Sequence, residues 1–308
     1  MVAVLLCPGQ GAQKVGMGRD LAERFPTARD TFAAIDEALG VPLSRIMWEG
    51  PAEELTLTHN AQPAILAHSA AVFAVVGNAL PDVVAGAGHS LGEYSAYVMA
   101  GALSPTDAAR LVRRRGELML EAGRERPGAM AAVLGLAGTE VETVCAEASD
   151  NAAVVVAANR NAPDQTVISG DPRAVDRAAE MCRARGARRV LPLKVSGAFH
   201  SPLMAPAVGG LAEALAGVPF GDPRFPVIAN AGAVAVTASG EATRLLEAQL
   251  TAPVRWVECM ETAHRLGPEA TYIEMGPGSV LSGLLRRILS APPKITLGTA
   301  DEVEAFLS

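Results

Sequence analysis

The stretch GAGHSLGEYSAYVMAGAL, residues 86–103, places one serine between two glycines and continues into an alanine-rich run. Residues 88–92 match the pattern G-x-S-x-G, in which glycines permit a sharp turn between a strand and a helix. An apolar run precedes this turn, and residues 93–100 favour a helix after it. The pattern predicts a parallel α/β sheet with Ser90 at the carboxyl end of a strand. The alternative is that Ser90 is only a small residue in a glycine-rich loop.

Composition narrows the fold class and the kinds of partner. Of 308 residues, 50% are hydrophobic but only 4% are aromatic, which favours helices packed on an aliphatic sheet. The net charge of -7 argues against a nucleic-acid partner, and no apolar run approaches the roughly 18 residues of a membrane span. The N-terminus lacks a basic leader, so we expect a cytoplasmic protein with no membrane partner. Four cysteines without metal-binding spacing are expected to be buried free thiols: Cys7, Cys145, Cys182 and Cys259.

Short apolar runs alternate with helical periods along most of the chain. The runs predict strands at residues 2–6, 83–86, 154–158, 190–195, 227–229 and 271–275. The periods predict helices at residues 21–39, 63–80, 105–121, 172–185, 206–215, 240–250 and 280–289. Strands that alternate with helices indicate a mostly parallel sheet.

The middle of the chain has a different order of elements. From residue 126 to 195 the predicted order is strand, helix, strand, strand, helix, strand, which is typical of a ferredoxin-like unit. We therefore expect a large α/β-hydrolase-like domain with a parallel sheet, formed by residues 1–125 and 197–308. A smaller inserted ferredoxin-like α+β domain is expected at residues 126–196.

A serine hydroxyl needs a base to react near neutral pH, and histidine is the natural one. His200 follows the predicted strand 190–195, at the sheet edge where such folds place their chemistry. No Asp or Glu stands out as a third member, so a backbone carbonyl could orient the ring. An ordinary loop histidine is the alternative for His200. His89 is expected to point away from the serine, although it lies in the same turn. His59 and His68 lie around a helix start and fit capping or core packing, and His264 fits an exposed position on a late helix.

Six sequence blocks carry a family resemblance. They are PGQGAQKVGMG (8–18), GHSLGEYSA (88–96), RRRGELM (113–119), GAFHSPLM (197–204), QLTAPVRW (249–256) and EMGPGSVLSGLL (274–285). In this order and spacing the chain resembles the malonyl-CoA:acyl carrier protein transacylases from end to end. The resemblance implies that a serine takes malonyl from coenzyme A and passes it to the phosphopantetheine thiol of an acyl carrier protein. It implies a ping-pong reaction of fatty-acid or polyketide synthesis with no cofactor, since malonyl-CoA is a substrate.

The resemblance also assigns roles around the serine. Ser90 would be the nucleophile and His200 the general base. Gln10 and the backbone N–H of Leu91 would form the oxyanion hole. Gln249 falls where the family has a glutamine whose main-chain carbonyl steadies the histidine, which would account for the missing acid.

The same resemblance implies a set of substrate-binding residues. Arg115 matches the arginine that grips the malonyl carboxylate, and a guanidinium suits this role because it offers two parallel donors. Either of the two preceding arginines could point inward instead. Phe199 would narrow the space for a branched acyl group, although a core aromatic is an equal alternative. His89 and Met119 are further expected substrate-binding residues.

Three other functions compete with acyl transfer. The same serine turn serves hydrolases, a non-catalytic scaffold could keep the fold, and the glycine-rich loop 9–18 could bind a nucleotide, although it lacks a P-loop ending. The carrier protein is expected to dock on local positive charge, either at residues 183–189 or at Arg113 and Arg114. No motif addresses the oligomeric state, and a monomer is our default expectation.

Overall fold

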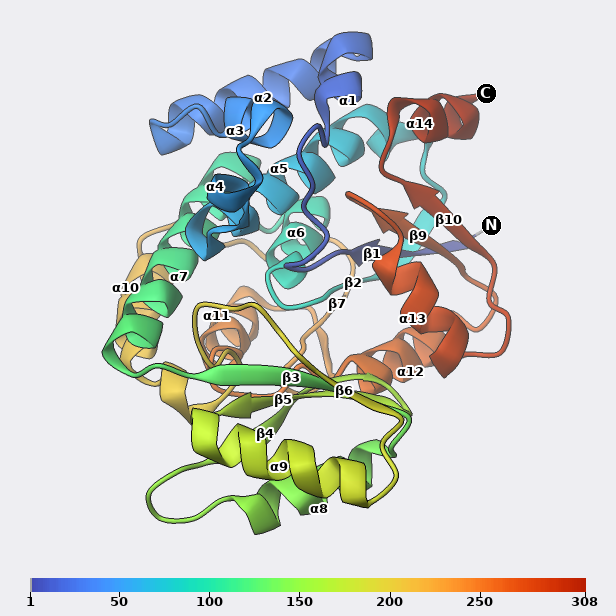
Figure 1. Cartoon of the computed structure of the whole chain (residues 1–308). Helices are drawn as coiled ribbons and strands as arrows, with labels where there is room; N and C mark the ends of the chain where they lie inside the picture. The colour runs from blue at the N-terminus through green and yellow to red at the C-terminus, as the bar shows by residue number, and fades with distance from the viewer. Residues whose placement is uncertain (1) are drawn as a thin grey trace.

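The fold is built around two separate sheets (Figure 1). The computed structural model describes residues 2–308. The larger sheet has the strand order β10-β9-β1-β2-β7-β8, and its neighbours are parallel except for β7 and β8. Its strands are β1 (Val2–Cys7), β2 (Asp82–Gly88), β7 (Val227–Ile228), β8 (Ala235–Val236), β9 (Thr271–Met275) and β10 (Lys294–Leu297). The mostly parallel sheet predicted from the sequence is confirmed.

Both faces of the larger sheet are covered by helices. Along β1, Leu5 and Cys7 enter one core, while Val4 and Leu6 enter the other, as the alternation of a strand buried on both faces requires. The first face carries α5 (Thr58–Val76), α6 (Gly92–Met99), α7 (Pro105–Glu125), α10 (Pro206–Ala216) and α11 (Ser239–Ala248). The second face carries α12 (Trp256–Leu266) and α13 (Val280–Ile288).

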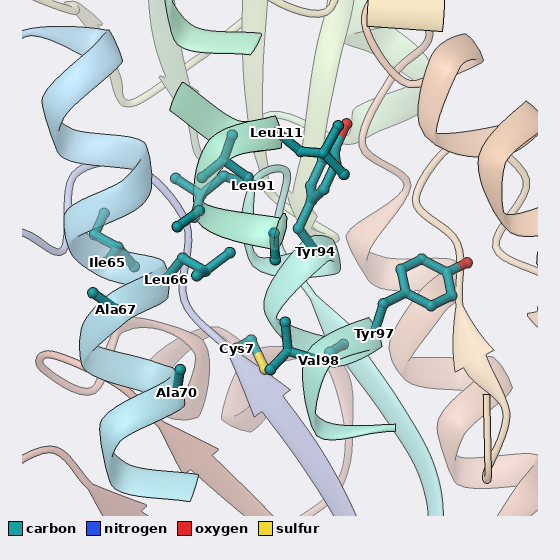
Figure 2. Packing of buried hydrophobic residues seen from close by; sticks show 14 of the residues in the cluster. Cys7, Ile65, Leu66, Ala67, Ala70, Leu91, Tyr94, Tyr97, Val98 and Leu111 are labelled. Atoms are coloured by element: carbon teal, nitrogen blue, oxygen red, sulfur yellow. The ribbon is translucent and has the colours of Figure 1, made fainter. Parts of the chain in front are cut away.

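The first core is centred on α5 and α6. Figure 2 shows Ile65 and Leu66 of α5 together with Leu91 and Val98, beside Cys7 at the end of β1. Nearly every residue of α5 is buried, which marks it as an interior helix rather than an amphipathic surface helix. Further helices cover it from outside: α2 (Pro26–Leu39), α3 (Leu43–Glu49), α4 (Ala52–Thr56) and α14 (Ala300–Leu307). Helix α1 (Arg19–Arg24) packs on α2 and α14.

The smaller sheet is antiparallel, with the order β4-β5-β3-β6. Its strands are β3 (Ala129–Leu134), β4 (Val155–Ala162), β5 (Gln165–Gly170) and β6 (Arg189–Pro192). Helices α8 (Gly138–Ala148) and α9 (Pro172–Ala184) cover one face and share a separate core with it. The opposite face turns toward the larger sheet (Figure 1).

The two chain crossings between the sheets lie against each other. A β-carbon placed on Gly123 would lie 2.1 Å from the backbone oxygen of Ser196, and one on Gly128 would lie 2.5 Å from the β-carbon of Ala198. Glycine at both positions lets the backbones approach this closely. The chain therefore leaves and re-enters the larger unit at one place.

Several predicted boundaries are wrong for identifiable reasons. The helix expected at 21–39 is two helices that are separated at Phe25, because Pro26 begins α2. The helix expected to begin at Pro63 begins at Thr58 and contains that proline. Pro63 has no N–H for the carbonyl of His59, and Arg113 donates to this carbonyl instead, at 3.2 Å.

The remaining differences concern short elements and strand ends. Helices α3, α4 and α14 and strand β10 fall in segments without a predicted element, and α12 is implied only by the placement of His264. Strand β4 extends beyond the expected 154–158, whereas β6 ends at Pro192 before the expected residue 195. Short 3-10 turns occur at Gly77–Ala79 and Pro202–Met204.

Two predictions from composition can be compared with the structure. All four cysteines are buried and free, as expected. Within residues 2–308, no helix combines the length and apolar character that crossing a bilayer demands.

Gly92 should be essential for packing α6 against the sheet. A β-carbon there would lie 2.2 Å from the backbone oxygen of Cys7 and 2.8 Å from that of Pro8. We expect Gly92→Ala to lower the free energy of unfolding by about 2–4 kcal/mol, measured by urea titration. The matched control is Gly209→Ala in α10, where a β-carbon meets nothing within 4 Å and should stabilise the helix slightly. Equal effects of the two substitutions would contradict the packing argument.

Candidate active site

Ser90 lies in the tight turn between β2 and α6. Its φ of 54° is in the left-handed region, which is unfavourable for a residue with a β-carbon. The turn is possible because a β-carbon on Gly88 would lie 1.9 Å from backbone atoms of Gly92. The Ser90 N–H donates to Asn230 Oδ1 at 2.7 Å, which fixes the turn from the side of β7. The hydroxyl is thereby held at the carboxyl end of the parallel strands.

The structure brings His200 to the Ser90 hydroxyl. Nε2 of His200 lies 2.7 Å from Ser90 Oγ, and Nδ1 lies 2.8 Å from the main-chain oxygen of Gln249. A carbonyl oxygen can only accept, so Nδ1 carries the proton and Nε2 can accept one from the serine. Within residues 2–308 the imidazole has no carboxylate hydrogen-bond partner. The Gln249 carbonyl orients the ring instead.

Burial keeps the His200 imidazole neutral. His200 is 4% exposed, and burial together with the positive charge of Arg115 lowers its pKa to about 3. At neutral pH the imidazole is therefore unprotonated, which is the form that can take a proton from a hydroxyl.

Arg115 reaches the same hydroxyl from α7. It is 1% exposed, and its Nη2 donates to Ser90 Oγ at 3.1 Å and to Gln249 Oε1 at 2.9 Å. Its Nη1 donates to Gln62 Oε1 at 2.7 Å. None of the ion pairs within residues 2–308 includes Arg115. A buried guanidinium without a carboxylate partner is costly, which indicates a binding site for an anionic group.

The register of α7 distinguishes the three adjacent arginines. Arg113 bonds Glu117 and the side chain of Asn60 on the outer side of the helix. Arg114 is exposed and lies near the same glutamate. Only Arg115 points toward Ser90, so the two alternatives left open by the sequence are resolved.

Three polar residues of the site were missed by the sequence reasoning. Gln62 holds Arg115, Asn230 holds Ser90, and buried Glu93 accepts from the Asn230 N–H at 2.9 Å and from Gln249 Nε2 at 2.7 Å. Asn230 directly follows the predicted strand 227–229, and this place at a strand end was the available signal. Glu93 follows the serine turn directly, but nothing in the sequence shows that its side chain is buried.

The N-terminus of α6 presents a free donor beside the serine. Within residues 2–308 the Leu91 N–H has no hydrogen-bond acceptor, and the helix dipole favours negative charge at this end. Gln10 lines the same cavity as Ser90, with its Nε2 3.5 Å from Thr58 Oγ1. The arrangement can stabilise an oxyanion next to the serine.

A cavity of about 380 Å³ opens over the serine between the two sheets. Met119 and Phe199 line it near His200, and Phe199 also packs in the first core. His89 lines the cavity and binds Asn161 through Nε2 at 2.8 Å, across to the smaller sheet. The antiparallel sheet contributes Met130, Ala132, Asn159, Asn161, Gln165 and Val167.

The other histidines lie away from Ser90. His68 is fully buried in the middle of α5, which fits core packing, and burial lowers its pKa to about 4. His59 lies in the first turn of α5, and His264 is exposed on α12.

The sequence matches known proteins over its whole length. The family model of the acyl transferase domain matches residues 4–302. The malonyl CoA-acyl carrier protein transacylase of Bacillus subtilis is 44% identical over 301 residues, which cover 97% of this chain and 94% of that protein. The protein of the same name from Escherichia coli K12 is 45% identical over 304 residues, which cover 97% of each.

Solved structures agree with the sequence matches. The acyl-carrier-protein S-malonyltransferase of Bartonella henselae superposes with a TM-score of 0.94 at 43% identity and covers 100% of this chain and 98% of its own. A malonyl-transacylase in complex with its type II PKS acyl-carrier protein gives a TM-score of 0.94 at 40% identity, with 99% and 98% covered.

The depressed pKa of His200 can be tested by NMR on isotope-labelled histidine. Because the pKa is lowered, the ring should stay neutral, with the proton on Nδ1, from pH 8 down to pH 5. The resonance is assigned by its loss in His200→Asn. A ring that gains a proton near pH 6.5 would contradict the burial of this imidazole.

Proposed function

The chain belongs to the acyl transferase domain family, among the malonyl-CoA:acyl carrier protein transacylases, and from that premise we propose a serine-based transfer of malonyl. Ser90 Oγ attacks the thioester carbonyl carbon of malonyl-CoA while its proton passes to His200 Nε2. The C–S bond breaks, and the coenzyme A sulfur leaves with that proton. The contact that supports this proposal most directly is the 2.7 Å distance between Ser90 Oγ and His200 Nε2.

The second half of the reaction reverses these roles. The phosphopantetheine thiol of an acyl carrier protein gives its proton to His200 Nε2, and the sulfur attacks the seryl ester. The C–O bond breaks, and Ser90 regains its proton. In both halves the Leu91 N–H and Gln10 stabilise the oxyanion. Each step uses a group that the chain supplies, so the proposed reaction requires no cofactor.

Arg115 is proposed to select malonyl over acetyl. Its guanidinium is already buried beside Ser90 Oγ, so a malonyl carboxylate at this position gains two charge-assisted donors. An acetyl group would leave the guanidinium without an anion. Phe199, Met119 and His89 line the space that the acyl group and its thiol arm would occupy.

The division into domains is also a proposal. Residues 126–196 form an inserted ferredoxin-like domain, since the order β4-β5-β3-β6 with two helices on one face matches the strand–helix order of such a unit. Residues 1–125 and 197–308 form an α/β-hydrolase-like domain, in which the serine turn follows a parallel strand.

Of the two basic clusters, the one at residues 183–189 is the better candidate for docking the carrier protein. Arg188 lies at Asp164, next to Gln165 at the cavity. Within this cluster Arg185 contributes less free positive charge, because it is already paired with two glutamates of α8. Arg113 lines a different hollow, of about 520 Å³, which does not include Ser90. A carrier protein of either fatty-acid or polyketide synthesis is proposed to dock on this same surface. The enzyme is proposed to act as a monomer in the cytoplasm.

The covalent intermediate provides the first test. Incubation with malonyl-CoA should add one malonyl group to Ser90, detected by mass spectrometry. Ser90→Ala should abolish the adduct, and His200→Ala should slow its formation by at least about 100-fold. The matched control Ser95→Ala removes another buried hydroxyl, five residues along on α6, and should leave the adduct unchanged.

The same assay separates transfer from hydrolysis and from a scaffold. With a phosphopantetheinylated carrier protein present, the malonyl group should move to the carrier thiol. Release of free malonate without a loaded carrier would identify a hydrolase. A wild-type chain that never forms the adduct would be a scaffold.

The role of Arg115 gives a prediction about selectivity. Arg115→Ala should lower the ratio of kcat/KM for malonyl-CoA to that for acetyl-CoA by about 10- to 1000-fold, because only malonyl uses the guanidinium. Arg114→Ala, one residue earlier on the exposed side of α7, should leave the ratio unchanged. An unaltered ratio in Arg115→Ala would remove the arginine from the proposed binding site.

A further inference from the structure

Glu93 is a buried acid that the proposed reaction does not use. It lies in the first turn of α6 and is fully buried. No ion pair within residues 2–308 includes it, and its Oε1 has no hydrogen-bond partner. A carboxylate in such surroundings needs a compensating charge or hydrogen bonds. Its position next to the serine turn suggests that the compensation comes from the active site.

The hydrogen bonds of Glu93 lead to both proposed catalytic residues. Its Oε2 accepts from the Asn230 N–H at 2.9 Å, and the Asn230 side chain in turn holds the Ser90 N–H. The same oxygen accepts from Gln249 Nε2 at 2.7 Å, and the Gln249 carbonyl oxygen holds the His200 ring. One carboxylate oxygen therefore anchors the supports of the nucleophile and of the base.

The Gln249 side chain also connects Glu93 to Arg115. Its Nε2 donates to Glu93, while its Oε1 accepts from Arg115 Nη2 at 2.9 Å. A buried negative charge and a buried positive charge thus lie on opposite sides of one amide. Neither has a direct ion-pair partner within residues 2–308, and Arg115 is the charged group that acts on the Glu93 carboxylate.

We propose that Glu93 is the counter-charge of Arg115 in the free enzyme and a positioning residue for Ser90 and His200, acting through Gln249 and Asn230. The inference rests on the proposed function, because it concerns how that site distinguishes acyl groups. A charged Glu93 offsets the cation when no malonyl is bound and repels a malonyl carboxylate when one arrives. Neutralising Glu93 should therefore strengthen malonyl binding relative to acetyl binding.

The Glu93 carboxyl group gains or loses its proton near neutral pH, so its charge changes with pH in this range. Burial raises the pKa of Glu93 to about 7, against the lowering effect of its hydrogen bonds and of Arg115. The other titratable groups around it are Tyr94 and Tyr97 on α6 and Cys259 on α12, and burial raises the pKa of each. These three groups stay neutral at neutral pH, so Arg115 is the charged group that Glu93 faces.

The decisive variant is Glu93→Gln, because its amide oxygen can accept both hydrogen bonds while the charge is lost. Acylation of Ser90 by malonyl-CoA and by acetyl-CoA is followed by intact-protein mass spectrometry at pH 8.5. The malonyl-to-acetyl ratio should rise by about five- to thirty-fold. Glu93→Leu, which also removes the hydrogen bonds, should slow both acylations by at least about tenfold.

A matched control separates this effect from the loss of any buried glutamate. Glu274 is fully buried, and its carboxylate accepts from the N–H groups of Leu281 and Ser282 at the start of α13 rather than from a group that holds Ser90 or His200. Glu274→Gln should leave the malonyl-to-acetyl ratio unchanged. A ratio that rises equally in both variants, or that does not rise in Glu93→Gln, would overturn the counter-charge role. Unchanged acylation rates in Glu93→Leu would overturn the positioning role.

The wild-type enzyme gives an independent measurement if the variants do not fold. As pH rises from 6 to 8.5, Glu93 loses its proton, so the malonyl-to-acetyl ratio should fall by about five- to thirty-fold. Both donors share coenzyme A, so its own ionisation cancels. A constant ratio would overturn the inference while leaving the malonyl adduct intact, whereas a wild-type enzyme without the adduct would overturn the proposed function itself.

Discussion

The close contact between the start of α6 and the ends of β1 and β2 determines the rest of the site. Only glycine fits at positions 88 and 92, because a side chain at either would overlap backbone atoms of its neighbour or of β1. This contact forces the intervening Ser90 into a left-handed conformation and aims the helix N-terminus at its hydroxyl. The cost of the strained turn is offset by the large core around α5 and α6, which holds both flanking elements in place.

The polar groups beneath the serine form one connected network rather than separate pairs. Gln249 contributes its main-chain carbonyl to His200 and its amide to Arg115, Glu93 and the Ser90 carbonyl. Linked hydrogen bonds make the site more rigid than isolated pairs, because Gln249 cannot turn without breaking several contacts at once. The main-chain carbonyl of Gln249 therefore stands where a Ser-His-Asp triad has the acid that orients the histidine.

Much of this arrangement could be predicted from the sequence, and the exceptions have physical causes. The G-x-S-x-G pattern identified the serine turn at the end of the parallel strand β2. The expectation that the strand before His200 ends at the same sheet edge was wrong, because that strand is β6 of the antiparallel sheet, and His200 follows the chain crossing back to the larger unit. The inward direction of Arg115 needed the helix register, which three consecutive arginines leave ambiguous. The sequence did not reveal the roles of Gln62, Asn230 and Glu93. An amide or carboxylate side chain in an apolar segment does not show which group it will hydrogen-bond. The break before Pro26 follows from that proline itself, which begins α2. The proline inside α5 depends on a tertiary contact, that of Arg113 with the freed carbonyl of His59.

The two chain crossings, at Gly123 to Gly128 and at Ser196 to Ala198, lie so close together that the smaller unit could be exchanged between related enzymes. The smaller unit begins and ends at adjacent points, so it can be grafted as a cassette through two junctions that lie side by side. The face of its sheet that turns toward the larger sheet forms one wall of the cavity, whereas Ser90, His200 and Arg115 all belong to the recipient. Chimeras made in this way would change the shape of the entrance without disturbing the chemistry at its base.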